Sequence, residues 1–314
     1  MSSYLVTGAA GFVGSALASR LLKEGHEVIT IDDLSTGYES ALPKRINFIQ
    51  GDCSDLSSFK TIQGKKIDAV FHIAGQSSGE VSFEDPIKDI KANTESTLQL
   101  LEFCVKNECS RFIYASTMSV YGTNDQIKVK ETENSSPKSF YAVGKLASEK
   151  YMDIYAGYGV KTSALRLFNV FGPGQNMSNL KQGMLSIYLE QFLNSEEVIV
   201  KGSQDRYRDF IYIDDVIEGF MRVLNRQNTF SKIINLGTGK KTTVKALLQM
   251  IEDKLLTEKK IRFVEGTPGD LFGITADTTI MNKLLGDWPK TSVLDGLENM
   301  INHINTSNKI NESE

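Results

Sequence analysis

Tyr141 and Lys145 stand four residues apart in the segment YAVGK, and a glycine-rich segment lies near the start of the same chain. Residues four apart share one face of a helix. We therefore expect the ammonium of Lys145 beside the phenol of Tyr141, where it favours the ionised phenol. Because free tyrosine has a pKa of about 10, a tyrosine base at neutral pH needs such a neighbour. The pair predicts a tyrosine base, although by itself it is equally typical of an ordinary helix surface.

The glycine-rich segment at residues 8–14 reads GAAGFVG and lies between an apolar run and a helical pattern. This order of strand, turn and helix is the context that a dinucleotide-binding turn requires. One glycine permits the turn, the next lets the backbone approach a pyrophosphate at the positive end of the helix, and the third allows close helix–strand packing. The spacing is GxxGxxG, a variant of GxGxxG, and a helix start that is glycine-rich by chance is the alternative. The predicted cofactor contacts here are Gly8, Gly11, Phe12, Val13 and Gly14.

The next expected strand, at residues 26–31, is followed by Asp32, eighteen residues after Gly14. A carboxylate at this place can accept hydrogen bonds from both hydroxyls of an adenosine ribose, and it repels a 2′-phosphate. Residues 33–37, DLSTG, contain no arginine that could receive such a phosphate. The sequence therefore predicts NAD as the cofactor, in preference to NADP.

Composition restricts the other function classes. The chain has 314 residues, 40% hydrophobic and 24% charged, and a formal net charge of −4, which is typical of a soluble globular protein with one large domain or two packed ones. Its lysines are dispersed, so we expect no nucleic acid partner. No apolar stretch suggests a membrane helix, and no signal peptide precedes the first strand. Three cysteines without metal spacing and only three histidines predict no metal site and favour a cytoplasmic location.

Strand and helix patterns alternate through the first half of the chain. We expect further strands at 46–50, 67–73, 111–115 and 160–168, a long helix at 86–107, and a later helix that carries Tyr141. This alternation predicts an α/β fold of the Rossmann type, a doubly wound parallel sheet with helices on both faces and ligands beyond the carboxyl ends of its strands. The residues of the long helix expected to face the core are Ile87, Ile90, Leu98, Leu101 and Val105.

Beyond residue 172 the pattern changes to shorter elements. We expect helices near 183–194, 214–225, 242–256 and 292–304, and strands near 198–200 and 233–236. We interpret residues 1–172 as an NAD-binding domain and 173–314 as a smaller α/β substrate-binding domain, with the segment 209–236 packing back on the first. The last ten residues, rich in asparagine, are expected to form a frayed tail.

Together these segments resemble the extended short-chain dehydrogenase/reductase family, specifically its nucleotide-sugar epimerases and dehydratases. The resemblance covers nearly the whole chain, from GAAGFVG to the segment PGD at 268–270. It implies that the GDC segment places Asp52 and Cys53 at the adenine. It also implies that the HIAGQ loop places Ala74 and Gln76 over the pyrophosphate and nicotinamide ribose, and that Asn93 braces the site from the long helix.

The same resemblance implies the catalytic and substrate-binding residues. In the segment STMSVYG it assigns a catalytic hydroxyl to Thr117, which can donate and accept and so bridge a substrate oxygen and Tyr141. Lys145, together with Tyr141, would also contact the nicotinamide ribose. The substrate's diphosphate would be bound by an asparagine of RLFNVFGP and an arginine of RDF, and the nucleotide ribose by an aspartate of PGD. The implied substrate-binding residues are Thr117, Asn169, Arg208, Asp270 and Ile274.

Three positions depart from the family pattern. Dehydratases carry an Asp-Glu pair directly after the threonine, and the related decarboxylases carry a glutamate there, whereas this chain has Met118 and Ser119. Both activities are disfavoured, because elimination then lacks its acid and base. Thr267 replaces a phosphate-binding arginine, so another residue, for example Arg206, would fill that role. Ile274 is intermediate in size between the aromatic residues that exclude acetamido sugars and the small residues that admit them.

The sequence therefore predicts an NAD-dependent nucleotide-sugar epimerase, an isomerase, with UDP-sugar 4-epimerisation through a 4-keto intermediate as the favoured activity. A nucleotide-sugar reductase or dehydrogenase, an epimerase at another carbon, and a dinucleotide-sensing regulator without chemistry are the alternatives. UDP, dTDP, CDP and GDP sugars are not distinguished. The resemblance implies a homodimer formed by the helix near 86–107 and the Tyr141 helix, although their apolar faces would serve equally as core.

Overall fold

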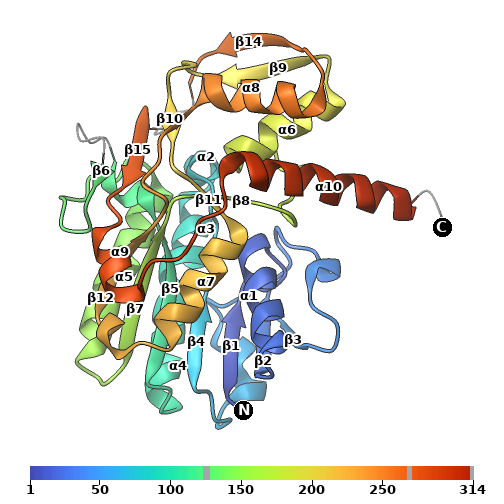
Figure 1. Cartoon of the computed structure of the whole chain (residues 1–314). Helices are drawn as coiled ribbons and strands as arrows, with labels where there is room; N and C mark the ends of the chain where they lie inside the picture. Colours follow the sequence, from blue (N-terminus) through green and yellow to red (C-terminus); the bar gives the residue numbers. More distant parts are fainter. Residues whose placement is uncertain (123–127, 267–270, 312–314) are drawn as a thin grey trace.

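A seven-stranded sheet lies at the centre of the computed structural model, which describes residues 1–122, 128–266 and 271–311 (Figure 1). Its strand order is β12-β7-β5-β4-β1-β2-β3, and all neighbouring strands are parallel. The strands are β1 (Ser3–Thr7), β2 (Glu27–Asp32), β3 (Asn47–Gln50), β4 (Ala69–His72), β5 (Arg111–Thr117), β7 (Lys161–Leu167) and β12 (Lys232–Leu236). The predicted α/β fold of the Rossmann type is confirmed.

Helices cover both faces of this sheet (Figure 1). On one face, Leu17 of α1 and Phe220 of α7 pack in the apolar core, and on the other, Leu100 of α4 and Met152 of α5 do so. Because both faces are covered, the strands are nearly continuous apolar runs. The helices are α1 (Phe12–Lys23), α2 (Gly79–Glu84), α3 (Pro86–Ile90), α4 (Ser96–Lys106), α5 (Phe140–Ala156) and α7 (Ile213–Leu224).

The predicted long helix contains a π-helical turn. It consists of α3, the π turn η3 (Lys91–Glu95) and α4 in direct succession. The carbonyl oxygen of Asn93 accepts hydrogen bonds from Thr97 Oγ1 and Ser148 Oγ, both at 2.8 Å. These hydroxyls occupy an acceptor that a regular helix would use for its own backbone, which accounts for the wider turn. Such turns are frequent at functional sites.

Three of the five apolar residues predicted to face the core from this helix are exposed. They are Ile87, Ile90 and Val105, with exposed fractions of 65%, 47% and 39%. The prediction is wrong because the buried face of the helix is polar at this point: Asp89 and Asn93 are 1% and 0% exposed. An apolar pattern identifies the wrong face where buried side chains are polar. Leu101 is buried and Leu98 is half-buried, as expected.

The smaller sheets, with α6 and α8, lie beyond the carboxyl edge of the main sheet, whereas α9 packs beside β12 and α7 (Figure 1). The strands of the smaller sheets pair in the orders β13-β10-β15-β6, β11-β8 and β14-β9. These strands are β6 (Lys128–Val129), β8 (Asn169–Phe171), β9 (Glu197–Lys201), β10 (Tyr207–Arg208), β11 (Phe210–Tyr212), β13 (Thr242–Thr243), β14 (Lys260–Val264) and β15 (Gly273–Ala276). The helices are α6 (Met184–Asn194), α8 (Val244–Leu255), α9 (Thr279–Leu285) and α10 (Val293–Asn311). Short turns are η1 (Glu39–Ala41), η2 (Leu56–Ile62), η4 (Met118–Tyr121) and η5 (Gln227–Thr229).

Helix α10 extends through most of the segment that the sequence predicted to be frayed. That prediction is wrong for residues 305–311, which continue the helix. Leu297 and Met300 anchor the helix in the core. Once a helix is anchored, each further residue adds a backbone hydrogen bond, and asparagine or serine costs only about 0.5–0.7 kcal/mol relative to alanine.

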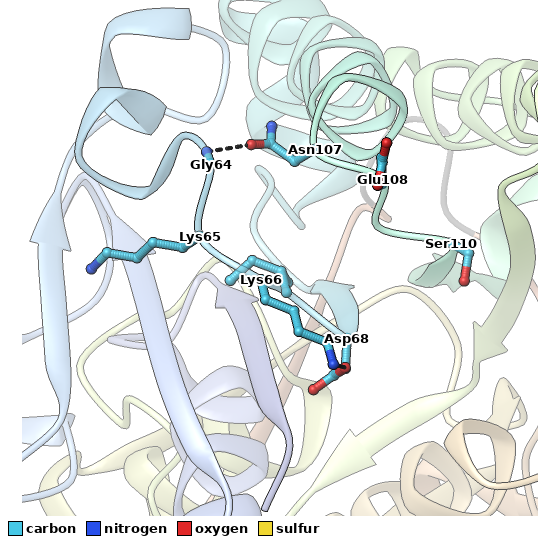
Figure 2. A pocket seen from close by; sticks show the side chains of 8 residues that line it. Gly64, Lys65, Lys66, Asp68, Asn107, Glu108 and Ser110 are labelled. Carbon is cyan, nitrogen blue, oxygen red and sulfur yellow. Dashed lines mark hydrogen bonds and ion pairs between the residues drawn. The ribbon is translucent and has the colours of Figure 1, made fainter.

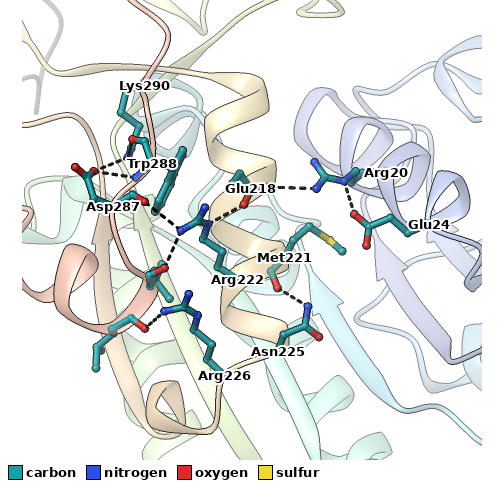
Figure 3. A network of polar contacts seen from close by, with 12 residues as sticks. Arg20, Glu24, Glu218, Met221, Arg222, Asn225, Arg226, Asp287, Trp288 and Lys290 are labelled. Carbon is teal, nitrogen blue, oxygen red and sulfur yellow. Dashed lines mark hydrogen bonds and ion pairs between the residues drawn. The ribbon is translucent and has the colours of Figure 1, made fainter.

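A polar network fastens α7 to α1 and to the segment that follows α9 (Figure 3). Glu218 accepts a hydrogen bond from Arg20 Nη2 at 3.2 Å and another from Arg222 Nε at 2.7 Å. Arg222 also donates to the carbonyl of Leu285 at 2.9 Å, and its guanidinium lies 4.6 Å from the ring centroid of Trp288. The network joins an early helix of the first domain to the last part of the chain.

A buried ion pair fixes α5 on the sheet. Arg166 of β7 donates to the two carboxylate oxygens of Glu149 at 2.9 and 2.7 Å, and the side chains are 3% and 0% exposed. Ser116 of β5 adds a hydrogen bond to Glu149 at 2.6 Å. These bonds hold α5, which carries Tyr141, against β5, which carries Thr117, and against β7.

Glu149→Ala should lower the free energy of unfolding by about 3–5 kcal/mol, because it leaves the guanidinium of Arg166 buried and unpaired. Urea unfolding followed by circular dichroism measures this loss. Glu298→Ala is the matched control: it removes a carboxylate that Lys254 contacts at 2.6 Å on the surface, and it should cost about 0–1 kcal/mol. Equal losses in the two variants would contradict the assignment.

Candidate active site

The loops that carry the predicted site residues meet at the carboxyl edge of the main sheet. The strand order reverses between β1 and β4, and doubly wound sheets bind ligands in the crevice at such a switch point. The turn with Gly8 follows β1, the loop from Ile73 follows β4, and Thr117 ends the neighbouring strand β5. Residues far apart in the sequence therefore share one edge.

Close backbone packing at the switch point depends on glycine. Gly8 has a φ of +71°, and a Cβ there would lie 2.7 Å from the backbone of Ala74, in the loop after β4. A Cβ on Gly14 would overlap the carbonyl oxygen of Gly8. Larger residues would force α1 and the two loops apart, so both glycines have the roles that the sequence indicates.

Helix α1 begins at this point without a side-chain cap. Gly11 is its N-cap residue, and no side chain accepts a hydrogen bond from its first amides. These amides and the positive end of the helix dipole suit a pyrophosphate. Asp32 accepts hydrogen bonds from the amides of Ala10 at 2.9 Å and Leu34 at 2.8 Å, and its carboxylate retains lone pairs for ribose hydroxyls. The residues present therefore fit NAD.

Other predicted cofactor contacts border the same edge. Asp52 is exposed and accepts a hydrogen bond from the amide of Ser54 at 2.7 Å. Cys53 is buried, and burial raises the pKa of its thiol. The side chain of Gln76 is already engaged within the protein, because its Nε2 donates to Asp89 Oδ1 at 2.7 Å.

Tyr141 lies in the first turn of α5, whose N-cap Ser139 accepts a hydrogen bond from the amide of Ala142 at 3.2 Å. The tyrosine is 9% exposed, and Thr117 lies close enough to act on its phenol. Burial raises the pKa of Tyr141 to about 12, and the hydroxyl of Thr117 opposes that rise. The structure thus brings the predicted base and hydroxyl together.

Lys145 is directed at the sheet more than at the phenol. Its Nζ donates to the carbonyl of Ala115 at 3.0 Å and lies 4.7 Å from the ring centroid of Tyr114, but 6.0 Å from that of Tyr141. The groups that shift the pKa of Tyr141 do not include Lys145, so the predicted lowering is wrong in the chain alone. Burial lowers the pKa of Lys145 to about 8, while Asp89 raises it.

Asn93 joins the site from the π turn. Its Nδ2 donates to the carbonyl of Gln76 at 2.9 Å and to Asp89 Oδ1 at 3.1 Å. A Cβ on Gly75 would lie 3.2 Å from Lys145 Nζ and would overlap Asn93 Oδ1, so the loop must be glycine here. Sequence reasoning missed Asp89. Its position four residues before Asn93, the spacing of the Tyr–Lys pair, is the signal that could have found it.

Three of the predicted substrate-binding residues lie on the smaller sheets. Asn169 begins β8, and its Oδ1 is buried without a hydrogen-bond partner. Arg208 of β10 is 3% exposed, donates to the carbonyl of Tyr207 at 2.7 Å, and pairs in register with Ile274 of β15. Ile274 is 1% exposed and belongs to an apolar cluster with Tyr121. Tyr121 lies one turn after Thr117, which carries the predicted catalytic hydroxyl.

Two positions of the predicted phosphate and ribose contacts lie outside the described residues. They are Asp270, the predicted ribose contact, and Thr267, which replaces a phosphate-binding arginine. Arg206, the candidate replacement for the missing arginine, is 8% exposed and donates to the carbonyl of Lys201. These assignments stay predictions.

A hollow of about 460 Å³ opens at the opposite edge of the main sheet (Figure 2). Its lining includes Lys66 and Asp68, which precede β4, and Ser110, which precedes β5. It is therefore separate from the switch point, and we assign it no chemistry. Within the described ranges, no group of three or more histidine, cysteine, aspartate or glutamate side chains is arranged to hold a metal ion. Nor is any helix in that part of the chain long and apolar enough to cross a membrane.

The model of the NAD dependent epimerase/dehydratase family matches residues 4–237. The chain belongs to this family. A UDP-glucose 4-epimerase of Mycolicibacterium smegmatis is 31% identical over 300 residues, which cover 93% of this chain and 95% of that protein. The predicted family and its NAD cofactor are confirmed.

Solved structures of this epimerase/dehydratase family share the fold. A UDP-glucose 4-epimerase of Thermotoga maritima with UDP-glucose is 32% identical, with a TM-score of 0.93 over 97% of this chain and 99% of that one. A UDP-glucuronic acid 4-epimerase of Bacillus cereus in complex with UDP-glucuronic acid and NAD is 30% identical, with a TM-score of 0.88 and coverage of 97% and 99%. The similarity therefore includes the smaller portion of the chain as well as the cofactor-binding one.

Asp32→Ser should weaken NAD binding about 10- to 100-fold, because hydrogen bonds to a charged group contribute about 1.5–3 kcal/mol. It should also reduce the preference for NAD over NADP, since the carboxylate no longer repels the 2′-phosphate. Titration calorimetry with each dinucleotide measures both effects. Asp33→Ser is the matched control, because its carboxylate is exposed and next in sequence. Unchanged preference in Asp32→Ser would show that the carboxylate does not select the cofactor.

Proposed function

We propose that the protein is a UDP-sugar 4-epimerase that acts through a 4-keto intermediate. The observation that carries this proposal is the buried Tyr141, whose phenol lies beside Thr117 at the edge of the sheet where the glycine turn fits NAD. Relatives that act on UDP-glucose and UDP-glucuronic acid support it. Reductase, dehydrogenase and other-carbon epimerase activities remain the alternatives to be tested.

The side chains can perform each proton step. Tyr141 removes the proton of the sugar 4-hydroxyl, and Thr117, which lies beside the phenol, aligns that hydroxyl. When bound, NAD supplies a hydride acceptor for C4, the corresponding donor for the return step, and a positive charge. Lys145 contributes a second positive charge below its pKa of about 8. After the keto sugar has turned over, Tyr141 returns the proton to O4 and the opposite epimer leaves.

The turn after Thr117 supports epimerisation over elimination. Met118 and Ser119 begin η4, where Thr117 Oγ1 accepts a hydrogen bond from the amide of Ser119 at 3.1 Å. Neither residue can protonate a leaving hydroxyl and abstract a carbon-bound proton as a carboxyl group can. Without an acid and a base at these two positions, the site is suited to oxidation and reduction at one sugar carbon and not to elimination.

An NMR time course tests the proposal. Purified protein without added cofactor, incubated with UDP-glucose, UDP-galactose, their N-acetyl counterparts or UDP-glucuronic acid, should convert one of them into a mixture with its 4-epimer. Tyr141→Phe should lower kcat about 10²- to 10⁴-fold with the fold intact, the usual contribution of a general base. Tyr155→Phe, on the same helix, should keep the activity.

The outcomes separate the alternatives. Product that forms only in step with a change in nicotinamide absorbance would indicate a reductase or dehydrogenase. No conversion of any UDP-sugar after NAD is added would overturn the proposal, as would a Tyr141→Phe variant with normal turnover.

We also infer a homodimer formed through one apolar helix face. This face comprises Phe83 of α2, Ile87 and Ile90 of α3, and Phe140 and Val143 of α5, which are between 42% and 65% exposed. The rings of Phe83 and Phe140 lie 5.5 Å apart, and α2, α3 and α5 contact one another. A contiguous apolar patch on helices is typical of a subunit interface. A second copy of the chain, with the same face, is the occupant we propose.

Val143→Lys should convert the dimer into a monomer, because the ammonium would be buried in an apolar interface. Light scattering coupled to gel filtration measures the mass. The control Phe263→Lys changes a side chain that is equally apolar and 48% exposed on β14, away from the apolar helix face. The inference fails if the unmodified protein is monomeric, or if the Val143→Lys variant keeps the mass of a dimer.

The cysteines support a cytoplasmic location. Cys104 and Cys109 are buried and free, and each affects the pKa of the other's thiol. Such a neighbouring pair persists as thiols in a reducing compartment.

A further inference from the structure

Asp89 is a buried acid beside the catalytic helix. The residue is 1% exposed and lies on α3, one turn before the π turn. Its Oδ1 accepts hydrogen bonds from Gln76 Nε2 at 2.7 Å and Asn93 Nδ2 at 3.1 Å. Two amide donors on one oxygen stabilise the ionised form. Burial raises the pKa of Asp89, and the bond from Gln76, the charge of Lys145 and the bond from Asn93 oppose that rise.

The second oxygen of Asp89 has no hydrogen-bond partner, although it is buried. A Cβ on Gly144 would lie 3.6 Å from this Oδ2, so the glycine allows the carboxylate to reach the turn of α5 between Tyr141 and Lys145. A buried carboxylate oxygen without a partner costs free energy and calls for an explanation. Lys145 follows Gly144 in the chain, and its positive charge and the charge of Asp89 act on each other.

The other titratable groups around this carboxylate are few. From α5 it faces Tyr141 and Lys145, and from β4 His72 approaches Lys145. His72 is wholly buried, and burial, followed by Lys145, lowers its pKa well below the usual value. The histidine is therefore neutral at physiological pH. Asp89 is the charged group that shifts the pKa of Lys145 among the described residues.

We propose that Asp89 is a positioning residue that keeps Lys145 charged beside Tyr141 and sets the pH range in which this pair works. The proposal deepens the epimerase function and rests on it for the role of the pair. It gives a reason for the burial of the polar residues Asp89 and Asn93, which apolar packing does not explain. The carboxylate acts through Lys145 and touches neither sugar nor cofactor.

The signs of the two electrostatic effects agree. The negative charge of Asp89 raises the pKa of Lys145, which burial has lowered, and it also raises the pKa of Tyr141. Removing the charge therefore lowers both pKa values. The limb of the pH–rate profile that requires the phenolate and the limb that requires the ammonium should both move to lower pH.

Asp89→Asn tests this, because it removes the charge and keeps the size of the side chain. Both limbs of the pH dependence of kcat should shift down by about one pH unit, the usual effect of a nearby buried charge. Asp153→Asn is the matched control, since it removes an exposed carboxylate from the same helix as Lys145. Its profile should be unchanged.

A second measurement is independent of turnover. In protein labelled with ¹³C at lysine Cε, the resonance that disappears in Lys145→Arg identifies Lys145, and its titration should move to lower pH in Asp89→Asn. Asp89→Ser provides a second charge-free variant if the asparagine variant does not fold. A uniform fall in kcat with unmoved limbs, or an unmoved Lys145 titration, would overturn the proposal. A shifted titration without epimerase activity would instead refute only the proposed function.

Discussion

Parallel pairing of β1 with both β2 and β4 is the constraint on which the rest of the structure depends. It brings the carboxyl ends of these strands to one edge, and the reversal of strand order between β1 and β4 leaves a crevice there. Asp32 and Thr117 are far apart in the chain, yet each ends a strand at this edge. Gly8 and Gly14 allow backbone to pack against backbone at this edge. A side chain at either glycine would separate the layers that the site joins.

Burial at this edge has opposite consequences for the two catalytic groups. It raises the pKa of Tyr141 and lowers that of Lys145, so it disfavours the charged form of each. The site works only if other groups restore those charges. Thr117 lowers the pKa of the phenol, and Asp89 raises the pKa of the ammonium but also that of the phenol. Tyr141 and Lys145 of α5 therefore act together with Asp89 of α3, and the spacing of residues along α5 does not reveal Asp89.

In α3 and η3 two polar side chains are buried and two apolar ones are exposed, the opposite of what the apolar pattern predicts. Asp89 and Asn93 are buried because they serve the site, and the π turn forms where hydroxyls bond the carbonyl of Asn93. Ile87 and Ile90 are then left on the outer face. Their exposure is costly in a monomer and natural at a contact with a second copy. One sequence pattern thus combines a buried polar face with the exposed apolar face from which we infer a dimer.

Local patterns in the sequence determined the strands of the main sheet, the glycine turn, the Tyr–Lys helix, the family and the choice of NAD, because each depends on residues close together in the chain. Which face of α3 is buried, where Lys145 points, and what surrounds the phenol were decided by tertiary structure. These depend on contacts such as that of Gly144 with Asp89, between elements separated by more than fifty residues. Periodicity assumes that buried means apolar, and it fails where buried charges are held by other buried groups. Charge and proton affinity are properties of such a packed environment, which no single segment contains.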